Sequence, residues 1–287
     1  MTDIFMLRGK KMIPFNFAYY RPDSLEEAVR IHSELTSKGL SAVYYSGGSE
    51  IITMCRAGSI RPDAVIDIKE IPELKSLAMD ESCLRIGSAC TLYKIKQSKA
   101  YPLLALACGR IADHTNQCRI TLGGNICGTI IYKETVPPLL LSDAEVTLLG
   151  PEGKRTVPFS DVFDGRIHLL PSELLVSAQI PKWALSAQHF HIKLTAQEKI
   201  DYPLVSIAAL IKDNFLRIAF SGVCSFPFRS QQIELVLNNK SLSISERAER
   251  AASLIPEEYS DRAGSAEYRR FVFKNAIEEL LEEWENG

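Results

Sequence analysis

The chain has 287 residues and a formal net charge of −2, which gives no electrostatic argument for binding nucleic acid or an anionic membrane. Apolar residues make up 46% and charged residues 24%, a composition typical of soluble globular proteins. No run of about 18 apolar residues is present, and Met1 to Lys11 has no apolar core of the signal-peptide kind. We therefore expect a cytoplasmic protein with no membrane segment, built from one large or two modest domains.

The first predicted elements are a helix and a strand. The helix begins after Asp23 or Ser24, and Glu27 follows Ser24 at the spacing of a capping box. Gly39 stands where a glycine would end the helix, and a strand over 41–45 follows it. The next predicted elements are a helix at 51–56 and strands at 64–68 and 84–88.

A predicted helix over 101–111 leads to a glycine pair in residues 122–125, which we interpret as a turn. Residues 145–149 and 155–157 have the pattern of two strands, and the glycine-containing stretch 150–153 between them predicts a tight hairpin turn.

Beyond residues 171–181, which we take as the end of the first half, the pattern changes. Alternating apolar residues predict antiparallel strands at 190–194, 205–211 and 216–221. Helical patterns follow at 230–237, 245–254 and 266–285. We therefore predict an α+β fold with domains at 12–174 and 175–287.

The seven cysteines are odd in number and scattered, and no Cys-x-x-Cys pair occurs. A local zinc or iron–sulfur site is therefore not expected, and we assign no metal ligands in this chain. We expect free thiols in a reducing compartment. The cysteines are Cys55, Cys83, Cys90, Cys108, Cys118, Cys127 and Cys224.

Two glycine pairs, Gly47-Gly48 and Gly123-Gly124, each follow an apolar segment. Glycine admits positive φ angles and lets backbone N–H groups approach an anion closely. Ser49, Thr121 and Asn125 add side-chain donors, so the two segments could hold one pyrophosphate from both sides. Taken singly, either segment is more readily an ordinary turn, because an isolated glycine motif is weak evidence.

Other phosphate-binding motifs are missing or incomplete. The sequence contains no Gly-x-Gly-x-x-Gly, which disfavours a Rossmann dinucleotide site. Residues 150–156 are similar to a P-loop but have the wrong spacing, so a hairpin turn is the better interpretation.

With these segments in order, the chain resembles the FAD-binding subunits of the molybdopterin-containing hydroxylase family, the xanthine and carbon monoxide dehydrogenase type. Residues 46–51, Ser-Gly-Gly-Ser-Glu-Ile, are similar to the family's first flavin loop, and residues 121–126, Thr-Leu-Gly-Gly-Asn-Ile, to its second. The resemblance runs from about residue 15 to the C-terminus, and further matching segments lie at 62–68, 71–74, 139–146 and 261–270.

The resemblance implies an FAD-binding domain of two subdomains, of the PCMH/vanillyl-alcohol-oxidase type, and a smaller C-terminal domain of antiparallel sheet and helices. It implies that both loops hold the FAD diphosphate, that Glu134 bonds the adenosine part and that Leu175 touches the adenine side. Lys193, Asp201 and Tyr202 are expected to approach the cofactor from the C-terminal domain. The full predicted set is Tyr45, Ser46, Gly47, Gly48, Ser49, Glu50, Ile51, Thr121, Gly123, Gly124, Asn125, Gly128, Glu134, Leu175, Lys193, Asp201 and Tyr202.

Three departures from the family pattern surround the second loop. Ile130-Ile131 stands where relatives carry Ser-Pro, and Glu134 replaces an aspartate. Residues 116–118 replace the family's Ile-Arg-Asn. These changes leave open the affinity for FAD and the geometry of the cofactor.

The resemblance implies an electron-transfer subunit. A molybdopterin-binding large subunit would hydroxylate a substrate such as a purine, and a [2Fe–2S] small subunit would pass electrons to FAD in this chain and then to NAD⁺ or another acceptor. One alternative is a stand-alone FAD-dependent oxidase or reductase, although the C-terminal half shows no acid/base constellation. Another is a scaffold that has lost FAD, although both glycine segments are intact. We assign no catalytic residue, and we expect His114, His189 and His191 to have surface or structural roles.

Overall fold

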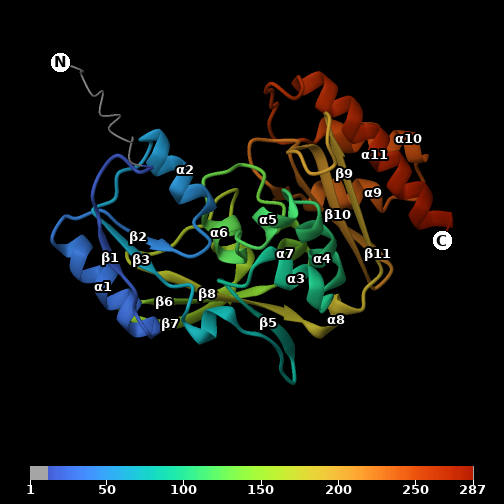
Figure 1. Cartoon of the computed structure of the whole chain (residues 1–287). Coiled ribbons are helices and arrows are strands. Elements are labelled where there is room, and N and C mark those ends of the chain that lie inside the picture. The colour runs from blue at the N-terminus through green and yellow to red at the C-terminus, as the bar shows by residue number, and fades with distance from the viewer. Residues whose placement is uncertain (1–11, 287) are drawn as a thin grey trace, which may run out of the picture.

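The computed structural model describes residues 12–286, so the prediction of no signal peptide in residues 1–11 lies outside the described part of the chain. The first unit is a three-stranded parallel sheet in the order β1-β3-β2 (Figure 1). Its elements are β1 (Ala18–Tyr20), α1 (Leu25–Ser37), β2 (Ala42–Tyr45), α2 (Ser49–Ala57) and β3 (Ala64–Asp67).

Helix α1 begins and ends where the sequence predicts. The Ser24 hydroxyl accepts a hydrogen bond from the Glu27 N–H, and the Glu27 carboxylate accepts one from the Asp23 N–H. Gly39 follows the helix with φ of +77°, a conformation that glycine adopts without steric cost. The buried face of α1 packs in one cluster with the small sheet and with Leu149 of the neighbouring sheet, so the first unit is joined to the second.

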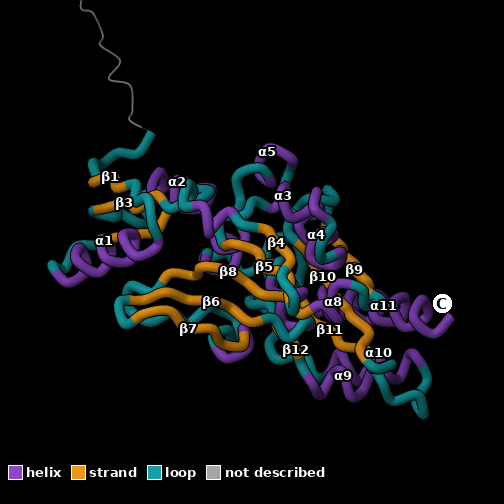
Figure 2. The backbone as a smooth tube through the Cα atoms, turned by 90° about the horizontal axis from the view of Figure 1, so that it is seen from below, coloured by secondary structure: helices purple, strands orange, loops and turns teal. Residues whose placement is uncertain are grey.

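The second unit is a five-stranded antiparallel sheet in the order β4-β5-β8-β6-β7, with five short helices gathered beside it (Figures 1 and 2). The strands are β4 (Leu77–Met79), β5 (Cys83–Gly87), β6 (Glu145–Gly150), β7 (Gly153–Pro158) and β8 (Leu174–Pro181); the helices are α3 (Leu92–Ser98), α4 (Pro102–Gly109), α5 (His114–Gln117), α6 (Leu122–Cys127) and α7 (Val136–Leu141), with 3₁₀ turns at Pro72–Lys75 and Phe159–Asp161. Strands β5, β6 and β8 share one apolar core with helices α3, α4, α6 and α7.

The third unit is a four-stranded antiparallel sheet in the order β12-β11-β10-β9. Helices α9 to α11 contact one face of it, and α4 and α7 of the second unit contact β9, β10 and β11 (Figure 1). Its elements are β9 (His189–Thr195), β10 (Pro203–Lys212), β11 (Phe215–Ser221), β12 (Phe228–Arg229), α9 (Gln231–Leu237), α10 (Ile244–Ser253) and α11 (Ala266–Asn286), and α8 (Lys182–Leu185) precedes them.

The predicted α+β class is confirmed, and the predicted 145–157 hairpin and antiparallel C-terminal sheet are present. The predicted boundary between residues 174 and 175 falls at the start of β8, which pairs with β5 and β6 in the middle of the five-stranded sheet. A domain that ended there would lose its central strand. We therefore propose that the C-terminal domain begins after α8, near residue 186, and that β8 belongs to the domain before it.

All seven cysteines are free thiols, and among the described residues no group of three or more His, Cys, Asp or Glu side chains could hold a metal ion. No helix in the described part of the chain has the length and apolar character needed to cross a membrane.

Candidate cofactor-binding site

The first glycine segment joins β2 to α2 and presents unpaired donors. Gly48 caps α2 with φ of +73°, and no side chain bonds to the helix start. The first-turn N–H groups of Ser49, Glu50 and Ile51, which an α-helix cannot satisfy internally, have no partner among the described residues. The buried hydroxyl of Ser46 has none there either. The first loop therefore offers a cluster of free donors to an anion.

Gly47 brings the two glycine segments together. A Cβ atom at this position would lie closer than 3.0 Å to the carbonyl oxygen of Arg119, a separation that Cβ atoms essentially never show. The missing side chain thus lets residues 119–120, just before the second segment, lie against the first loop. The requirement at Gly47 is close approach and not a positive φ, which among the four paired glycines only Gly48 adopts.

The second glycine segment is the first turn of α6 rather than the loop turn that we predicted. Thr121 caps the helix, and its hydroxyl accepts a hydrogen bond from the Gly124 N–H at 3.1 Å. The Leu122 N–H donates to the Cys90 carbonyl and the Gly123 N–H to the Ser88 carbonyl, at 2.9 and 2.8 Å. These donors are occupied, so the second segment shapes the site without adding the free N–H groups that the first loop has.

Glu50 connects the start of α2 to the residues after α6. Its carboxylate accepts hydrogen bonds from the Thr129 N–H at 2.7 Å and from the Thr129 hydroxyl. Gly128 lies directly against the same carboxylate, because a Cβ there would be closer than 3.0 Å to Glu50 Oε2. Gly128 is therefore a contact residue of Glu50, and Glu50 is turned toward Thr129.

Residues 133–135 are three consecutive buried polar side chains, each with a separate partner. The Lys133 ammonium donates to the carbonyls of Ile126, at 2.9 Å, and Gly128. The Thr135 hydroxyl donates to Asn125 Oδ1 at 2.6 Å. Asn125 is therefore held by the chain that follows α6, and its side-chain oxygen is occupied.

Glu134 forms a buried ion pair with Lys193 of β9. The Lys193 ammonium donates to Glu134 Oε2 at 3.0 Å and to the Arg110 carbonyl at 2.7 Å. Burial raises the pKa of Glu134 to about 7 against the opposing effect of Lys193, and burial lowers the pKa of Lys193. Glu134 Oε1 is buried with no partner among the described residues, so one carboxylate oxygen remains available to accept a hydrogen bond.

Residues 15–183, more than half of the chain, match the family model described as the FAD binding domain in molybdopterin dehydrogenase. The chain belongs to this family. It is 28% identical to the carbon monoxide dehydrogenase medium chain of Hydrogenophaga pseudoflava, over 94% of this chain and 97% of that one. It is 26% identical to the xanthine dehydrogenase FAD-binding subunit of Escherichia coli O157:H7, over 94% and 96% of the two chains. The solved structure of carbon monoxide dehydrogenase from H. pseudoflava superposes with a TM-score of 0.81 at 27% identity, covering 93% of this chain and 96% of that one.

The residues of this family member fit FAD. Two features favour a large anionic cofactor: the free donors of the first loop with the unpartnered Ser46 hydroxyl, and the unpartnered Glu134 oxygen. The donors suit a diphosphate, and the carboxylate oxygen suits a sugar hydroxyl. A site that left these groups unsatisfied would be costly, so a polar ligand accounts for both.

The remaining predicted residues occupy different surroundings. Leu175 is 3% exposed and packs in the core of the second unit. Tyr202 is 58% exposed and stacks on Tyr132, with ring centroids 4.7 Å apart. Asp201 lies beside it in the β9–β10 connection and accepts a hydrogen bond from the Glu198 N–H at 2.9 Å. Tyr202 and Asp201 are therefore accessible from solvent, whereas Leu175 is enclosed.

The departures from the family pattern have local explanations at two places. Gln117 donates to the carbonyls of Ile111 and Ala112, both at 3.1 Å, so it fixes the turn before α5. Cys118 is exposed, and its sulfur lies 3.8 Å from His114 Nε2. Nothing in the structure explains the isoleucine pair at 130–131.

His114, His189 and His191, three of the five histidines, have structural contacts and no arrangement of catalytic partners among the described residues. His114 packs edge-on against Tyr93, and His189 bonds to the Ala187 carbonyl. Burial lowers the pKa of His191 to about 4, with the positive charges of Arg110 and Lys193 acting in the same direction. A neutral His191 beside the Glu134–Lys193 pair is consistent with a structural role.

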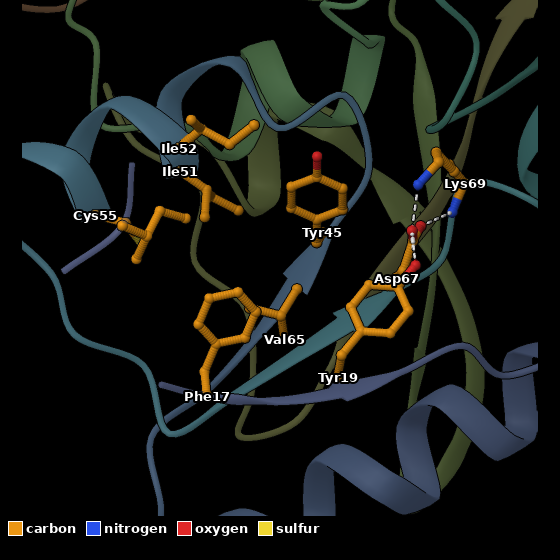
Figure 3. Close-up of a pocket in the computed structure, with 10 residues that line it drawn as sticks. Phe17, Tyr19, Tyr45, Ile51, Ile52, Cys55, Val65, Asp67 and Lys69 are labelled. Atoms are coloured by element: carbon orange, nitrogen blue, oxygen red, sulfur yellow. Dashed lines mark hydrogen bonds and ion pairs between the residues drawn. The ribbon is translucent and has the colours of Figure 1, made fainter. Parts of the chain in front are cut away.

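A separate pocket of about 250 Å³ lies between α2 and the three-stranded sheet, and Figure 3 shows its side chains. The Asp67 carboxylate at one end accepts hydrogen bonds from the Tyr19 hydroxyl at 2.5 Å and from Lys69. The polar end of this pocket is thus internally paired, unlike the first loop. Tyr45, the predicted site residue before the first loop, is one of its walls; the full lining is Ile13, Phe17, Tyr19, Tyr45, Ile51, Ile52, Cys55, Val65, Asp67 and Lys69.

Lys133, Thr135 and Arg110 are site residues that the sequence interpretation missed. Their contacts are mostly to backbone carbonyls, which leave no recognisable pattern in a single sequence. The one available signal was the run Lys-Glu-Thr at 133–135, an unusual polar stretch between apolar segments.

Proposed function

We propose that this chain is the FAD-carrying, electron-transfer subunit of a heteromeric molybdenum hydroxylase. Electrons would arrive from a [2Fe–2S] small subunit and leave to NAD⁺ or another acceptor, and a molybdopterin-binding large subunit would act on the organic substrate. The observation that carries the proposal is the first loop, with three free N–H groups at the start of α2 and an unpartnered buried hydroxyl at Ser46.

The first loop would bind the diphosphate. Helix N-termini attract anions through their free N–H groups and the helix dipole, and α2 has nine residues over which that dipole builds. Ser46 would add a hydroxyl donor from the preceding residue. The packed second segment would act as a wall that fixes the position of the first loop through Gly47.

Glu134 would accept a hydrogen bond from a hydroxyl of the cofactor through Oε1, while Lys193 holds Oε2. Asp201 and Tyr202 would approach the cofactor from the C-terminal domain. When bound, FAD supplies the electron-transfer chemistry, and the protein contributes binding and orientation.

The proposed partners follow from the family and from the cysteines. Among the described residues no set of side chains could hold a metal, so molybdenum and iron–sulfur centres would reside in other subunits. One relative, from Paenarthrobacter nicotinovorans, is a dehydrogenase complex subunit, 26% identical over 94% of this chain. The binding of partner subunits and the transfer of electrons to a final acceptor are both part of this proposal.

The test is FAD binding by the purified chain. We expect flavin absorption bands near roughly 370 and 450 nm, with FAD as the released cofactor. Ser46→Ala should weaken FAD binding about threefold to tenfold, because one hydrogen bond contributes on the order of 1 kcal/mol. Ser59→Ala, at the opposite exposed end of α2, is the matched control and should bind FAD as the wild type does.

Two results would contradict the proposal. Hydroxylation of an organic substrate by the isolated chain would favour a stand-alone enzyme. Absence of flavin both from the reconstituted chain and from the complex purified with its partners would favour a scaffold without FAD.

A further inference from the structure

The tetrapeptide Tyr132–Thr135 alternates between two parts of the molecule. Tyr132 and Glu134 bond to the C-terminal domain, through Asp261 and Lys193. Lys133 and Thr135 bond to α6 or to the residues at its end. The side chains alternate between the two parts although the backbone is not extended, since Lys133 has φ of +23°. Lys133 is thus the only cationic side chain of this segment, and it faces the glycine segments.

Both the side chain and the backbone of Lys133 are unusually constrained. Its side chain is buried, and its backbone has φ of +23°, which few residues other than glycine adopt. Its ammonium bonds to the carbonyls of Ile126 and Gly128, which lie at the C-terminal end of α6. A buried, strained lysine is costly, so the arrangement points to a specific requirement for a cation here.

Glu50 lies on the other side of the same short segment. Lys133 fixes Gly128 by donating to the Gly128 carbonyl. The Glu50 carboxylate accepts hydrogen bonds from the N–H and the hydroxyl of the next residue, Thr129. Glu50 is the second residue of α2, where a carboxylate would otherwise turn onto the free N–H groups of its own helix. Held toward Thr129, it leaves those groups open.

We propose that Lys133 is a positioning residue for the diphosphate site: it fixes residues 128–129 so that Glu50 is held away from the start of α2, and its charge offsets that of Glu50. This inference rests on the proposed FAD function. Two negative phosphates beside an uncompensated Glu50 would repel it, whereas a lysine beside the same segment reduces that repulsion.

The electrostatic surroundings of Lys133 agree with this role. Burial lowers the pKa of Lys133, and the nearby Cys127 and Glu50 act in the opposite direction. Cys127 lies on α6 and Glu50 on α2, so both opposing influences come from the helices beside the two glycine segments.

The experiment measures FAD affinity, by quenching of flavin fluorescence, in the full-length chain and five variants. Lys133→Met should bind FAD at least about tenfold more weakly. Adding Glu50→Gln to Lys133→Met should restore most of the affinity, because the competing carboxylate is then neutral. A purely structural role for Lys133 would not be rescued by a change at Glu50.

The other three variants guard against misfolding and general charge effects. Thr129→Val removes the hydroxyl that holds Glu50 at an exposed position, so it should also weaken FAD binding and also be rescued by Glu50→Gln. Lys94→Met removes an exposed lysine that likewise bonds to a backbone carbonyl, and it should bind FAD normally. Thermal melting of each apoprotein identifies any variant that fails to fold.

The outcomes separate this inference from the function on which it rests. If the wild type binds no FAD, the proposed function fails, and this inference fails with it. If the wild type binds FAD but Lys133→Met and Thr129→Val bind equally well, or if Glu50→Gln rescues neither, this inference alone is overturned.

Discussion

The Glu134 carboxylate and the Lys193 ammonium group form a buried ion pair, with exposed fractions of 4% and 0% for the two side chains. Attraction between the charges opposes the loss of hydration, and the two effects nearly cancel for most buried pairs. Here the desolvation of Glu134 is the larger effect, since its pKa lies above its ordinary value of 4.5 despite the lysine. The unpartnered Oε1 explains this imbalance, because half of the carboxylate receives no donor.

The pH dependence of stability follows from this shift. A carboxyl group whose folded pKa is raised contributes stability below its unfolded pKa of about 4.5, and that contribution is lost as pH rises through about 7. In the apoprotein, the wild type should therefore lose stability relative to Glu134→Gln as the pH rises from 4.5 to 7. Urea unfolding at half-unit pH steps measures it.

Glu173 provides a control, because its pKa is shifted in the opposite direction. Burial alone would raise the pKa of Glu173, but hydrogen bonds from Arg155 and from the Leu170 N–H outweigh burial and lower it. Its stability contribution is present above about pH 4.5 and is lost on acidification. Glu173→Gln should therefore change relative to wild type only below that pH. Parallel curves for the two variants would contradict both assignments.

Single residues were predictable where they belong to a pattern. Ser46, Glu50 and Glu134 lie in segments whose order identified the family. Lys133 was not predictable, because its partners are carbonyl oxygens and its role depends on a positive φ that sequence does not encode. The bonding of Glu50 to Thr129 was also out of reach, since the two residues are distant in sequence.

At the scale of elements, the two short helices α2 and α6 differ in the state of their first N–H groups, although each has a glycine pair at its start. Helix α2 starts with its donors free, whereas α6 starts with its donors bonded to Thr121, Ser88 and Cys90. The difference arises from the neighbours. The start of α6 packs against Ser88 and Cys90, just after β5, whereas the start of α2 has no such backbone acceptors among the described residues.

Gly47→Ala tests the contact between the two segments. The added methyl group would collide with the Arg119 carbonyl, which is backbone and cannot rotate away. We expect a loss of stability of about 1–3 kcal/mol, as for other overpacked sites, and loss of most FAD binding. Calorimetry of the apoprotein and FAD titration measure the two effects.

Gly109→Ala is the matched control for this change. Gly109 ends α4, and a Cβ there would meet only the flexible Lys96 side chain at 3.5 Å. Alanine is the better helix former, so this variant should be unchanged or slightly more stable. Equal losses in the two variants would show that the Gly47 contact has no special role.

Elements with local signals were predicted well. Helix α1 carried an N-cap serine with the spacing of a capping box and a terminal glycine, and the β6–β7 hairpin carried its turn. Strand β8 was not recognised as the centre of its sheet, because its partners β5 and β6 are remote in sequence and pairing depends on tertiary contacts. Helix α6 was taken for a turn because two glycines weaken any helical pattern.

In the whole molecule, polar contacts attach the C-terminal domain to the second unit at Tyr132, which bonds to Asp261, and at two further places. One is the cofactor side, through Lys193, Arg110 and Glu134. The other is Asp143, in the turn after α7, which receives two hydrogen bonds from Arg217 at 2.6 and 2.8 Å. The domains are thus joined by polar contacts as well as by apolar packing of the C-terminal sheet on α4 and α7.

Asp143→Asn should loosen the second attachment. Asparagine tolerates the φ of +52° at this position but loses the charge that pairs with Arg217. The pair is half exposed, so we expect a cost of about 1 kcal/mol, with broader calorimetric unfolding as the domains become less coupled. An unchanged, single sharp transition would show that apolar packing alone couples them.

The arrangement of domains was predictable in kind and not in detail. The change from mixed to alternating patterns near residue 175 correctly indicated an antiparallel C-terminal sheet. The contacts that attach the domains could not be predicted, because charged residues such as Asp143 and Arg217 have no distinguishing pattern in the sequence.

The ion pair between Glu134 and Lys193 also bears on the order in which the site is completed during synthesis. A nascent chain that has emerged only as far as β8 contains both glycine segments, yet its Glu134 lacks the Lys193 ammonium group with which it pairs. The last part of the pocket is supplied by β9, whose place in its sheet is set by pairing with β10. We therefore expect a chain truncated before β9 to bind FAD more weakly than the full chain, because its Glu134 lacks the Lys193 partner.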